Sequence, residues 1–262
     1  VKLGNFTKFM AQDNGKFLGY HVPKGHSYHG KTNDIVPGEA ALALIHLAEY
    51  FDDDSWIAPL DKYWSYYMPV FRERAASKRE NVAWPWFTYG NEMRLSLVQM
   101  GPWTVMAANA YHRRTGNKDV AAFGLEVARW MIDTYQWTSD RSPWPDYVGG
   151  YFKLRQELPA MQAFCYAEGT AAAYQLAIRY APDQVPYFEE STREAMRLGL
   201  AMQYTELDTY GFSRPMQVMG GIRYALNETK VRIDYVHHAL SSMYGYYKGA
   251  LEDPNLPASV KK

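Results

Sequence analysis

The chain has 262 residues, enough for a sizeable hydrophobic core, and its 28 Lys and Arg balance its 28 Asp and Glu. Without a basic excess, a nucleic acid is not an expected partner, because nonspecific binding to phosphates depends on such an excess. No apolar run reaches the roughly 18 residues of a membrane span, and the single Cys165 rules out an intramolecular disulfide. Aromatic residues make up 16% of the chain, and they suit both helix packing and stacking on sugar rings.

The chain begins with a segment rich in turn formers, residues 11–34, which predicts a long loop with a short hairpin at Asp13-Asn14-Gly15. Helices follow at about 37–51, 55–77, 92–114, 118–135, 161–180, 186–204 and 231–251, with little strand. Pro69 and the Gly101-Pro102 pair each predict a kink or break, and Gly116 is placed to end a helix in the left-handed conformation.

These helices alternate in character along the chain. A Gly- or Pro-marked loop leads into a helix rich in small residues, and an aromatic amphipathic helix follows. The clearest copy runs from Gly149-Gly150-Tyr151-Phe152 through the Ala-rich helix to PYFEESTREAMRLGLAMQY, and looser copies begin near Pro37, Tyr89 and Gly220. A helix pair repeated at roughly 50 to 70 residues indicates an array in which each pair buries its apolar face against its neighbours.

The segments PGEAALALIHLAEYFDD, GGYFKLRQELPAMQAFCYAEGTAAAYQLA and GGIRYALNETKVRIDYVHHALSSMYGYY resemble helical hairpins of the α/α-toroid, six-hairpin-glycosidase-like superfamily. The resemblance implies an all-α toroid over residues 1–262 as one domain, with small-residue helices inside and substrate-binding loops leading into them. It also implies a carbohydrate-active protein, because the family includes glycoside hydrolases, polysaccharide lyases and sugar epimerases. The chain shows about four hairpins rather than six, so either the ring is smaller or further hairpins precede it on a longer chain.

Five carboxylates lie near the loop ends of the expected inner helices: Asp34, Glu39, Glu92, Glu168 and Asp234. Glycoside hydrolysis needs two, one protonated and one ionised. Glu168 interrupts an apolar stretch, and burial disfavours the charged form of a carboxylate, which suits a general acid. An ion pair with an Arg of a neighbouring helix is the alternative for Glu168. For Glu39, the helix dipole alone accounts for an acidic residue in the first turn.

The start of the last helix carries a second group of polar residues. Asp234 and His238 are four apart and share a helix face, where a carboxylate can orient an imidazole. Arg223 could grip an acidic sugar or tie its loop to Asp234. We expect Glu168 and Asp234 to line one cleft as the catalytic pair, with Glu39 as a further candidate, and Tyr166, Arg223 and His238 to bind substrate.

Two loops join tryptophan with proline, around Trp84 and Trp86 and at Trp144. Such loops could stack on sugar rings or simply cover the end of a helical core.

No metal site or other cofactor is expected. His21, His26 and His29 match no standard zinc spacing, and Cys165 lies among apolar residues that predict a packed thiol.

The sequence thus predicts a glycoside hydrolase that acts on an oligo- or polysaccharide by carboxylate acid/base chemistry. A lyase or epimerase using His or Tyr with Arg is the first alternative, and a toroid that only binds glycan or protein is the second. The resemblance favours a periplasmic or secreted location, which no motif in the chain fixes.

Overall fold

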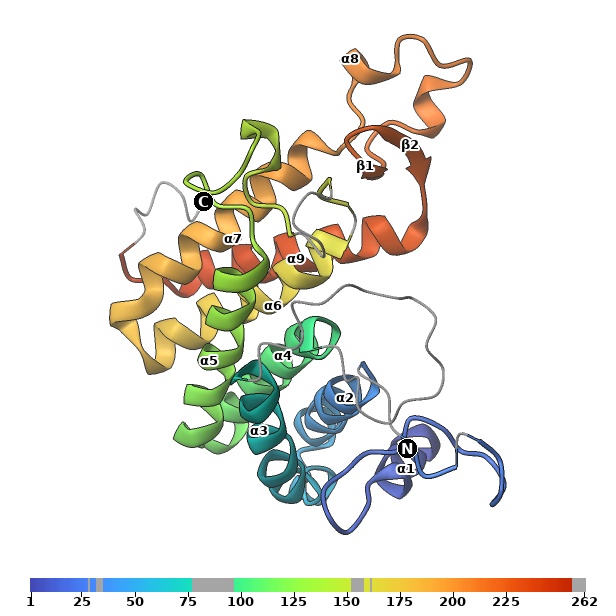
Figure 1. Cartoon of the computed structure of the whole chain (residues 1–262), viewed down its shortest axis with the longest axis vertical. Helices are drawn as coiled ribbons and strands as arrows, with labels where there is room; N and C mark the ends of the chain where they lie inside the picture. Colours follow the sequence, from blue (N-terminus) through green and yellow to red (C-terminus); the bar gives the residue numbers. More distant parts are fainter. Residues whose placement is uncertain (28, 32–34, 77–96, 152–157, 161, 256–262) are drawn as a thin grey trace. The chain divides into compact units, whose positions relative to one another are not determined.

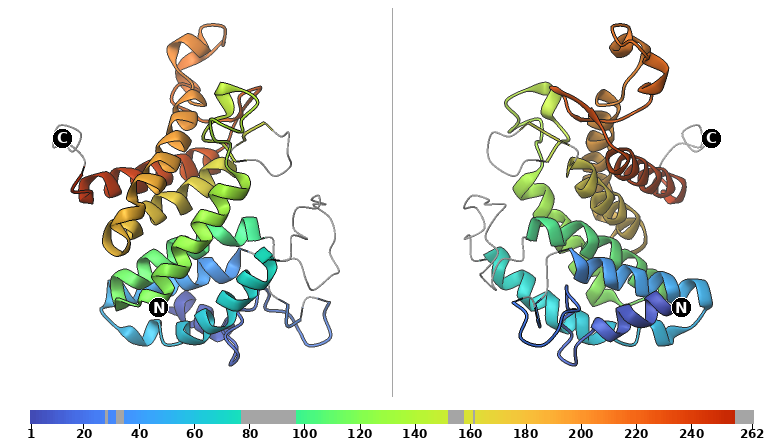
Figure 2. Two further views of the ribbon diagram at one scale, coloured as in Figure 1. Left: turned by 60° about the vertical axis from the view of Figure 1, so that its left-hand side comes forward. Right: turned by 90° about the vertical axis from the view of Figure 1, so that its right-hand side faces the viewer.

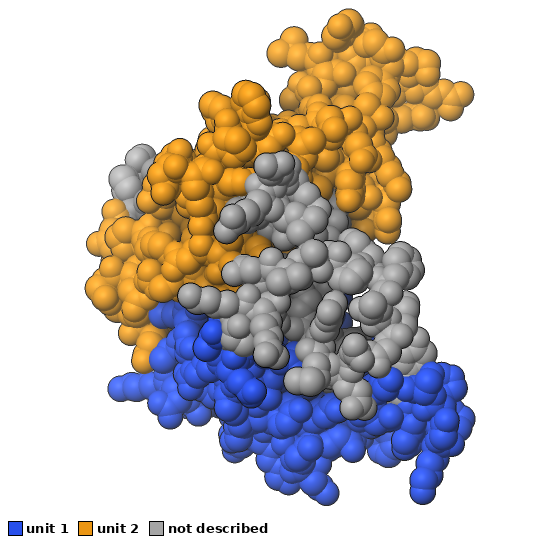
Figure 3. Space-filling view, viewed as in Figure 1, with its two compact units in different colours: residues 1–127 blue, residues 128–262 orange. Residues whose placement is uncertain are grey.

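The computed structural model describes residues 1–27, 29–31, 35–76, 97–151, 158–160 and 162–255 (Figure 1). The chain divides into two compact units, residues 1–127 and 128–262, which are described one at a time (Figure 3). The described residues form nine α-helices and one two-stranded antiparallel sheet, which confirms the predicted all-α class. The closure of the hairpins into a toroid stays a prediction, as does a single domain over residues 1–262.

The first unit contains α1 (Lys2–Met10), α2 (Val36–Phe51), α3 (Leu60–Ala76), α4 (Leu97–Thr115) and the first half of α5 (Lys118–Tyr135). Its core is aromatic and aliphatic. Leu44 and Ile45 of α2 and Tyr63, Tyr67 and Phe71 of α3 are almost completely buried. Burial of each such side chain contributes about 1.5–3 kcal/mol.

Helices α2 and α4 of the first unit run parallel to each other. Near their N-terminal ends, Gly38 lies so close to Trp103 that a Cβ on the glycine would be 2.5 Å from the Trp103 Cβ. Near their C-terminal ends, Arg113 binds Glu49 at 2.5 Å. Helix α3 begins beside the C-terminal part of α4, because Asp61 in its first turn accepts a hydrogen bond from the Tyr111 hydroxyl at 2.8 Å. Helices α2 and α4 thus lie side by side, and the aromatic helix α3 begins next to the end of α4.

The second unit begins with the second half of α5 and continues through α6 (Gln162–Tyr180), α7 (Val185–Ala201) and the short α8 (Glu206–Thr209). Strands β1 (Arg223–Ala225) and β2 (Glu228–Val231) form a hairpin that leads into α9 (Ile233–Glu252). An isolated bridge pairs Ala160, just before α6, with Ala225 of β1. The loops that lead into α6 and α9 therefore lie next to each other.

Helices α6 and α9 also run parallel and pack closely (Figures 1 and 2). A Cβ on Gly245 would lie 3.1 Å from the Ala171 Cβ, and one on Gly249 would lie 2.5 Å from the Tyr174 ring. The Gln175 side chain donates to the Gly245 carbonyl at 2.8 Å. The missing side chain at Gly249 is what leaves room for the Tyr174 ring against α9.

Helix α7 packs antiparallel against this pair. Gly199 near its C-terminal end lies against Phe164 in the first turn of α6, with 2.8 Å between a built Cβ and the ring. The Tyr246 hydroxyl of α9 donates to Glu189 of α7 at 2.6 Å. The second unit thus consists mainly of two parallel helices in close contact, α6 and α9, with α7 antiparallel to them.

Several local predictions can be compared with this structure. The hairpin at Asp13-Asn14-Gly15 is present, since Ala11 pairs with Phe17 across it. Gly116 has the expected left-handed φ of 70°. Pro69 and Pro102 do not break their helices: α3 and α4 continue through them, since a helix can lose one backbone hydrogen bond and remain intact. No helix in the described part of the chain combines the length and the apolar character needed to span a bilayer.

Candidate functional site

Three side chains of the second unit converge between α6 and α9. Cys165 and Glu168 are three residues apart in α6 and therefore share a face of that helix. His238, in the second turn of α9, hydrogen-bonds to Glu168 with 2.8 Å between Nδ1 and Oε2. The Cys165 sulfur, a Glu168 carboxylate oxygen and a ring nitrogen of His238 all lie within 4.8 Å of one another. We call these three residues the α6–α9 cluster.

The close packing of the two helices explains why the cluster forms. Glu168 and His238 lie in the N-terminal halves of two parallel helices, one and two turns before the contact of Ala171 with Gly245. The side chains that meet there come from positions 70 residues apart in the sequence. The hydrogen bond between them therefore joins the two helices near their N-terminal ends.

Burial makes this interaction strong. The Glu168 side chain is 3% exposed and that of His238 is 16% exposed. A buried carboxylate is costly unless it is hydrogen-bonded or paired, and His238 supplies that partner. Hydrogen bonds with Cys165 and with Glu168 favour the charged imidazole and raise the pKa of His238 to about 10. Glu168 and His238 therefore form an ion pair that joins α6 to α9.

The arrangement differs from a Cys–His–Glu catalytic relay. In a relay the thiol and the carboxylate contact opposite nitrogens of the imidazole, which separates sulfur from oxygen by roughly 7 Å. Here the sulfur and a carboxylate oxygen are within 4.8 Å of each other. The three groups instead point toward one small volume, as ligands of a metal ion do.

Two candidate residues from the sequence are thus brought together, but not with the partners that were expected. Glu168 pairs with a histidine rather than an arginine of the neighbouring helix. Asp234, expected to orient His238, binds the Arg232 guanidinium at 2.9 Å. That Glu168 and Asp234 line one cleft stays a prediction.

Arg223 has a structural partner. Its guanidinium binds Asp208 of α8 at 2.9 Å and lies 4.9 Å from the centre of the Tyr204 ring. The alternative in which Arg223 ties its loop to Asp234 does not match these contacts. Arg223 instead holds the α8 loop against β1.

The remaining candidates are more scattered. Glu39 is exposed in the first turn of α2, in the other unit. Tyr166 is buried, with its ring centre 4.9 Å from that of Tyr151. Trp144 is 61% exposed, as a stacking residue would need to be. Outside the described residues lie Trp84, Trp86, Asp34 and Glu92.

Cys165 is the site residue that the sequence reasoning missed. Its apolar neighbours in the sequence predicted a packed, inert thiol, yet it is only partly buried and lies beside two ionisable groups. The signal available was its spacing of three residues from Glu168, which puts both on one helix face.

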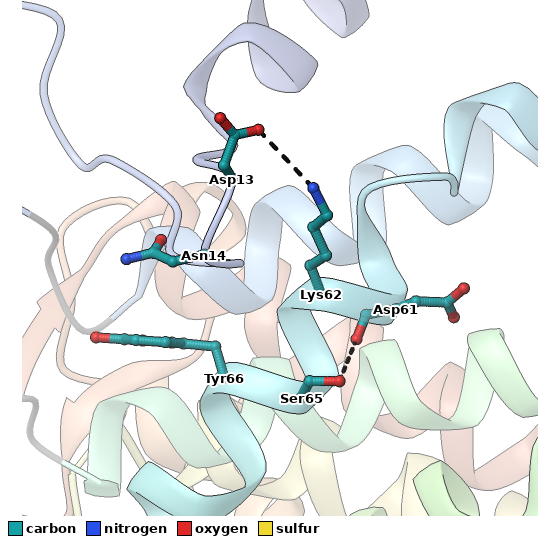
Figure 4. Close-up of a pocket in the computed structure, with 6 residues that line it drawn as sticks. All are labelled: Asp13, Asn14, Asp61, Lys62, Ser65 and Tyr66. Atoms are coloured by element: carbon teal, nitrogen blue, oxygen red, sulfur yellow. Dashed lines mark hydrogen bonds and ion pairs between the residues drawn. The ribbon is translucent and has the colours of Figure 1, made fainter.

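A separate hollow of about 330 Å³ lies in the first unit, between the 13–14 turn and α3 (Figure 4). Lys62 extends toward Asp13 across it, 3.8 Å away, and Ser65 turns back to the Asp61 carbonyl at 2.8 Å. The hollow contains none of the predicted site residues, and several of its polar groups already pair with each other. We therefore take the α6–α9 cluster as the candidate site.

Comparison with known proteins finds no match to a family model, to a curated protein or to a solved structure. The toroid superfamily therefore stays a prediction, and function is inferred from the residues of this chain and their geometry.

Proposed function

We propose that this chain is a carbohydrate-active enzyme that acts on an oligo- or polysaccharide, with Glu168 and His238 as its catalytic acid/base pair. The observation that carries the proposal is the 2.8 Å hydrogen bond between these two side chains. They lie on neighbouring small-residue helices, near the adjacent loops that lead into both. In the family that the sequence resembles, loops of this kind carry the substrate groove.

The chemistry that best fits a carboxylate–imidazole pair is proton transfer at a sugar carbon, as in a lyase or an epimerase. The carboxylate orients the ring and balances the charge of the imidazolium, which donates a proton to the substrate as a general acid and takes a proton back in its neutral form. A substrate whose reacting carbon adjoins a carbonyl or carboxyl group suits this chemistry.

Glycoside hydrolysis is the second candidate, and one observation favours it. Asp234 lies one helical turn before His238 on α9, so a second carboxylate shares that face of the helix. Hydrolysis by two carboxylates would then use Glu168 and Asp234.

The test is a screen of oligo- and polysaccharides with the purified protein, followed by turnover measurements on two Gln variants. Glu168→Gln keeps the size of the side chain and removes its charge, and should cut turnover by about 10²–10⁴-fold with little change in substrate affinity. Glu189→Gln is the matched control, because Glu189 also links α9 to a neighbouring helix, through Tyr246. The control should keep its activity.

Reaction in deuterated water separates the two chemistries. Deuterium on a sugar carbon of the product indicates epimerisation. A new reducing end with an unsaturated sugar at the other side of the break indicates elimination, whereas new reducing ends without unsaturation or deuterium indicate hydrolysis. Full activity of Glu168→Gln would refute the catalytic assignment. Binding of a glycan that the wild type never converts would favour the non-catalytic alternative.

A further inference from the structure

Acid/base chemistry at the candidate site uses two of the three members of the α6–α9 cluster and leaves Cys165 without a role. The sulfur is nevertheless held within 4.8 Å of a carboxylate oxygen and an imidazole nitrogen. The chain has one cysteine in 262 residues. Its position beside a buried ion pair therefore calls for a separate explanation.

The three groups are a suitable ligand set for zinc. Thiolate, imidazole and carboxylate all bind this ion, at about 2.3 Å for sulfur and about 2.0–2.2 Å for nitrogen and oxygen. In a tetrahedral site with these bond lengths, ligand atoms are roughly 3.3–3.8 Å apart. The observed limit of 4.8 Å requires only small rotations of side chains to reach such a site.

The surroundings also meet the needs of a metal site. Glu168 is almost completely buried, whereas His238 and Cys165 are partly accessible, so an ion can enter from the side of these two residues. Two of the ligands come from one helix face and the third from a helix packed firmly against it. Three protein ligands leave a fourth position for water or a substrate oxygen, as in open zinc sites.

We propose that Cys165, Glu168 and His238 form a binding site for a divalent transition metal ion, zinc in particular, and that bound zinc switches off the acid/base pair. The inhibition by zinc rests on the proposed function, whereas the binding site does not. Zinc would occupy the carboxylate oxygen and the ring nitrogen that acid/base catalysis requires, so metal binding and turnover exclude each other. Binding replaces the thiol proton and a proton of the imidazolium ring, and both protons pass to solvent.

Direct binding measurements test the site without reference to any sugar. Zinc is added to the purified chain in competition with a chromophoric chelator, and cobalt is added separately to obtain a spectrum. We expect one zinc ion per chain at this site and a sulfur-to-cobalt charge-transfer band. Because Cys165 is the only thiol, its reaction with a maleimide reports on this site alone, and zinc should slow that reaction strongly.

Two variants and one control test the assignment of Cys165 and His238 as ligands. Cys165→Ser and His238→Gln should each weaken zinc binding by more than the roughly 10- to 100-fold loss typical of outer-shell partners. His237→Gln is the matched control, because His237 is the exposed neighbour of His238 on the same helix, and it should bind zinc as the wild type does. Circular dichroism checks that each variant folds. Cobalt binding without the charge-transfer band, or thiol reactivity that zinc leaves unchanged, would overturn the site.

Turnover measurements then test separately whether bound zinc inhibits the acid/base pair. On a substrate that the wild type converts, zinc should inhibit the wild type at the concentration that protects its thiol. Cys165→Ser should need far more zinc for the same fractional inhibition, whatever its own turnover without zinc. Zinc binding with no effect on turnover would refute inhibition by zinc but would still support the zinc-binding site. If turnover depends on Glu168 but the chain binds no zinc, the zinc-binding site is refuted and the proposed catalytic function is still supported.

Discussion

Replacement of Gly249 by Ala tests the packing that creates the α6–α9 cluster. A Cβ at this position of α9 would lie 2.5 and 2.6 Å from two carbons of the Tyr174 ring. That ring is completely buried, and its hydroxyl donates to the Asp253 carboxylate at 2.9 Å. The methyl group therefore has to displace the ring or push the two helices apart.

Three contributions determine how much Gly249→Ala lowers the free energy of unfolding. Overpacking costs about 1–3 kcal/mol, and a weakened hydrogen bond to a charged group costs up to about 1.5–3 kcal/mol. Helix propensity returns about 1 kcal/mol, because Ala is a better helix former than Gly. When the hydrogen bond is lost, these contributions give a net decrease of about 1.5–5 kcal/mol in the free energy of unfolding of the second unit.

Gly245→Ala is the matched control on the same helix. Its Cβ would lie 3.1 Å from the Ala171 Cβ, a contact that a small shift relieves, so its stability should stay within about 1 kcal/mol of the wild type. Hydrogen exchange of peptides from α6 and α9 measures the stability of this seam in both variants. Equal protection in the two variants, or a Gly249→Ala chain more stable than the wild type, would refute the packing argument.

Two further predictions concern polar interactions of the second unit. Ser191→Ala removes the 2.6 Å hydrogen bond to the buried Gln136 oxygen and should destabilise the unit by about 1–3 kcal/mol in urea unfolding, a result that an unchanged midpoint would contradict. The pKa of Asp208 is lowered from 3.8 to about 2 by hydrogen bonds from Thr205 and then from Arg223, so its stabilising contribution is present above pH 4 and is lost as the pH falls toward 2. Hydrogen exchange of the α8 loop should accelerate over this range in the wild type, whereas Asp208→Asn should show little pH dependence beyond that of intrinsic exchange.

The local structure was largely predictable because its signals are local. The helix at 118–135 has the predicted limits, since Gly116 ends the preceding helix and the Asn117 side chain accepts a hydrogen bond from the Val120 backbone. Alternation of small-residue and aromatic helices also indicated helix pairs. The parallel packing of α6 and α9 could not be predicted in this way, because it depends on contacts between residues far apart in the sequence, such as that of Gly249 with Tyr174.

Two residues of the α6–α9 cluster, Glu168 and His238, could be picked out from the sequence, but Cys165 and the grouping of the three could not. Glu168 stood out as a carboxylate among apolar neighbours, and His238 stood out by its spacing from Asp234. The spacing suggested the wrong partner, since His238 bonds to Glu168 and Asp234 binds Arg232. Spacing along one helix reports only neighbours on that helix, and the true partner lies 70 residues away.

We propose above that Cys165, Glu168 and His238 together form a binding site for zinc. Anomalous diffraction at the zinc edge, from crystals of the chain with zinc, tests it most directly. We expect a peak about 2.3 Å from the Cys165 sulfur and about 2.0–2.2 Å from a Glu168 oxygen and a His238 nitrogen. Zinc found only on other residues, with the Glu168–His238 hydrogen bond intact and no density beside Cys165, would contradict it.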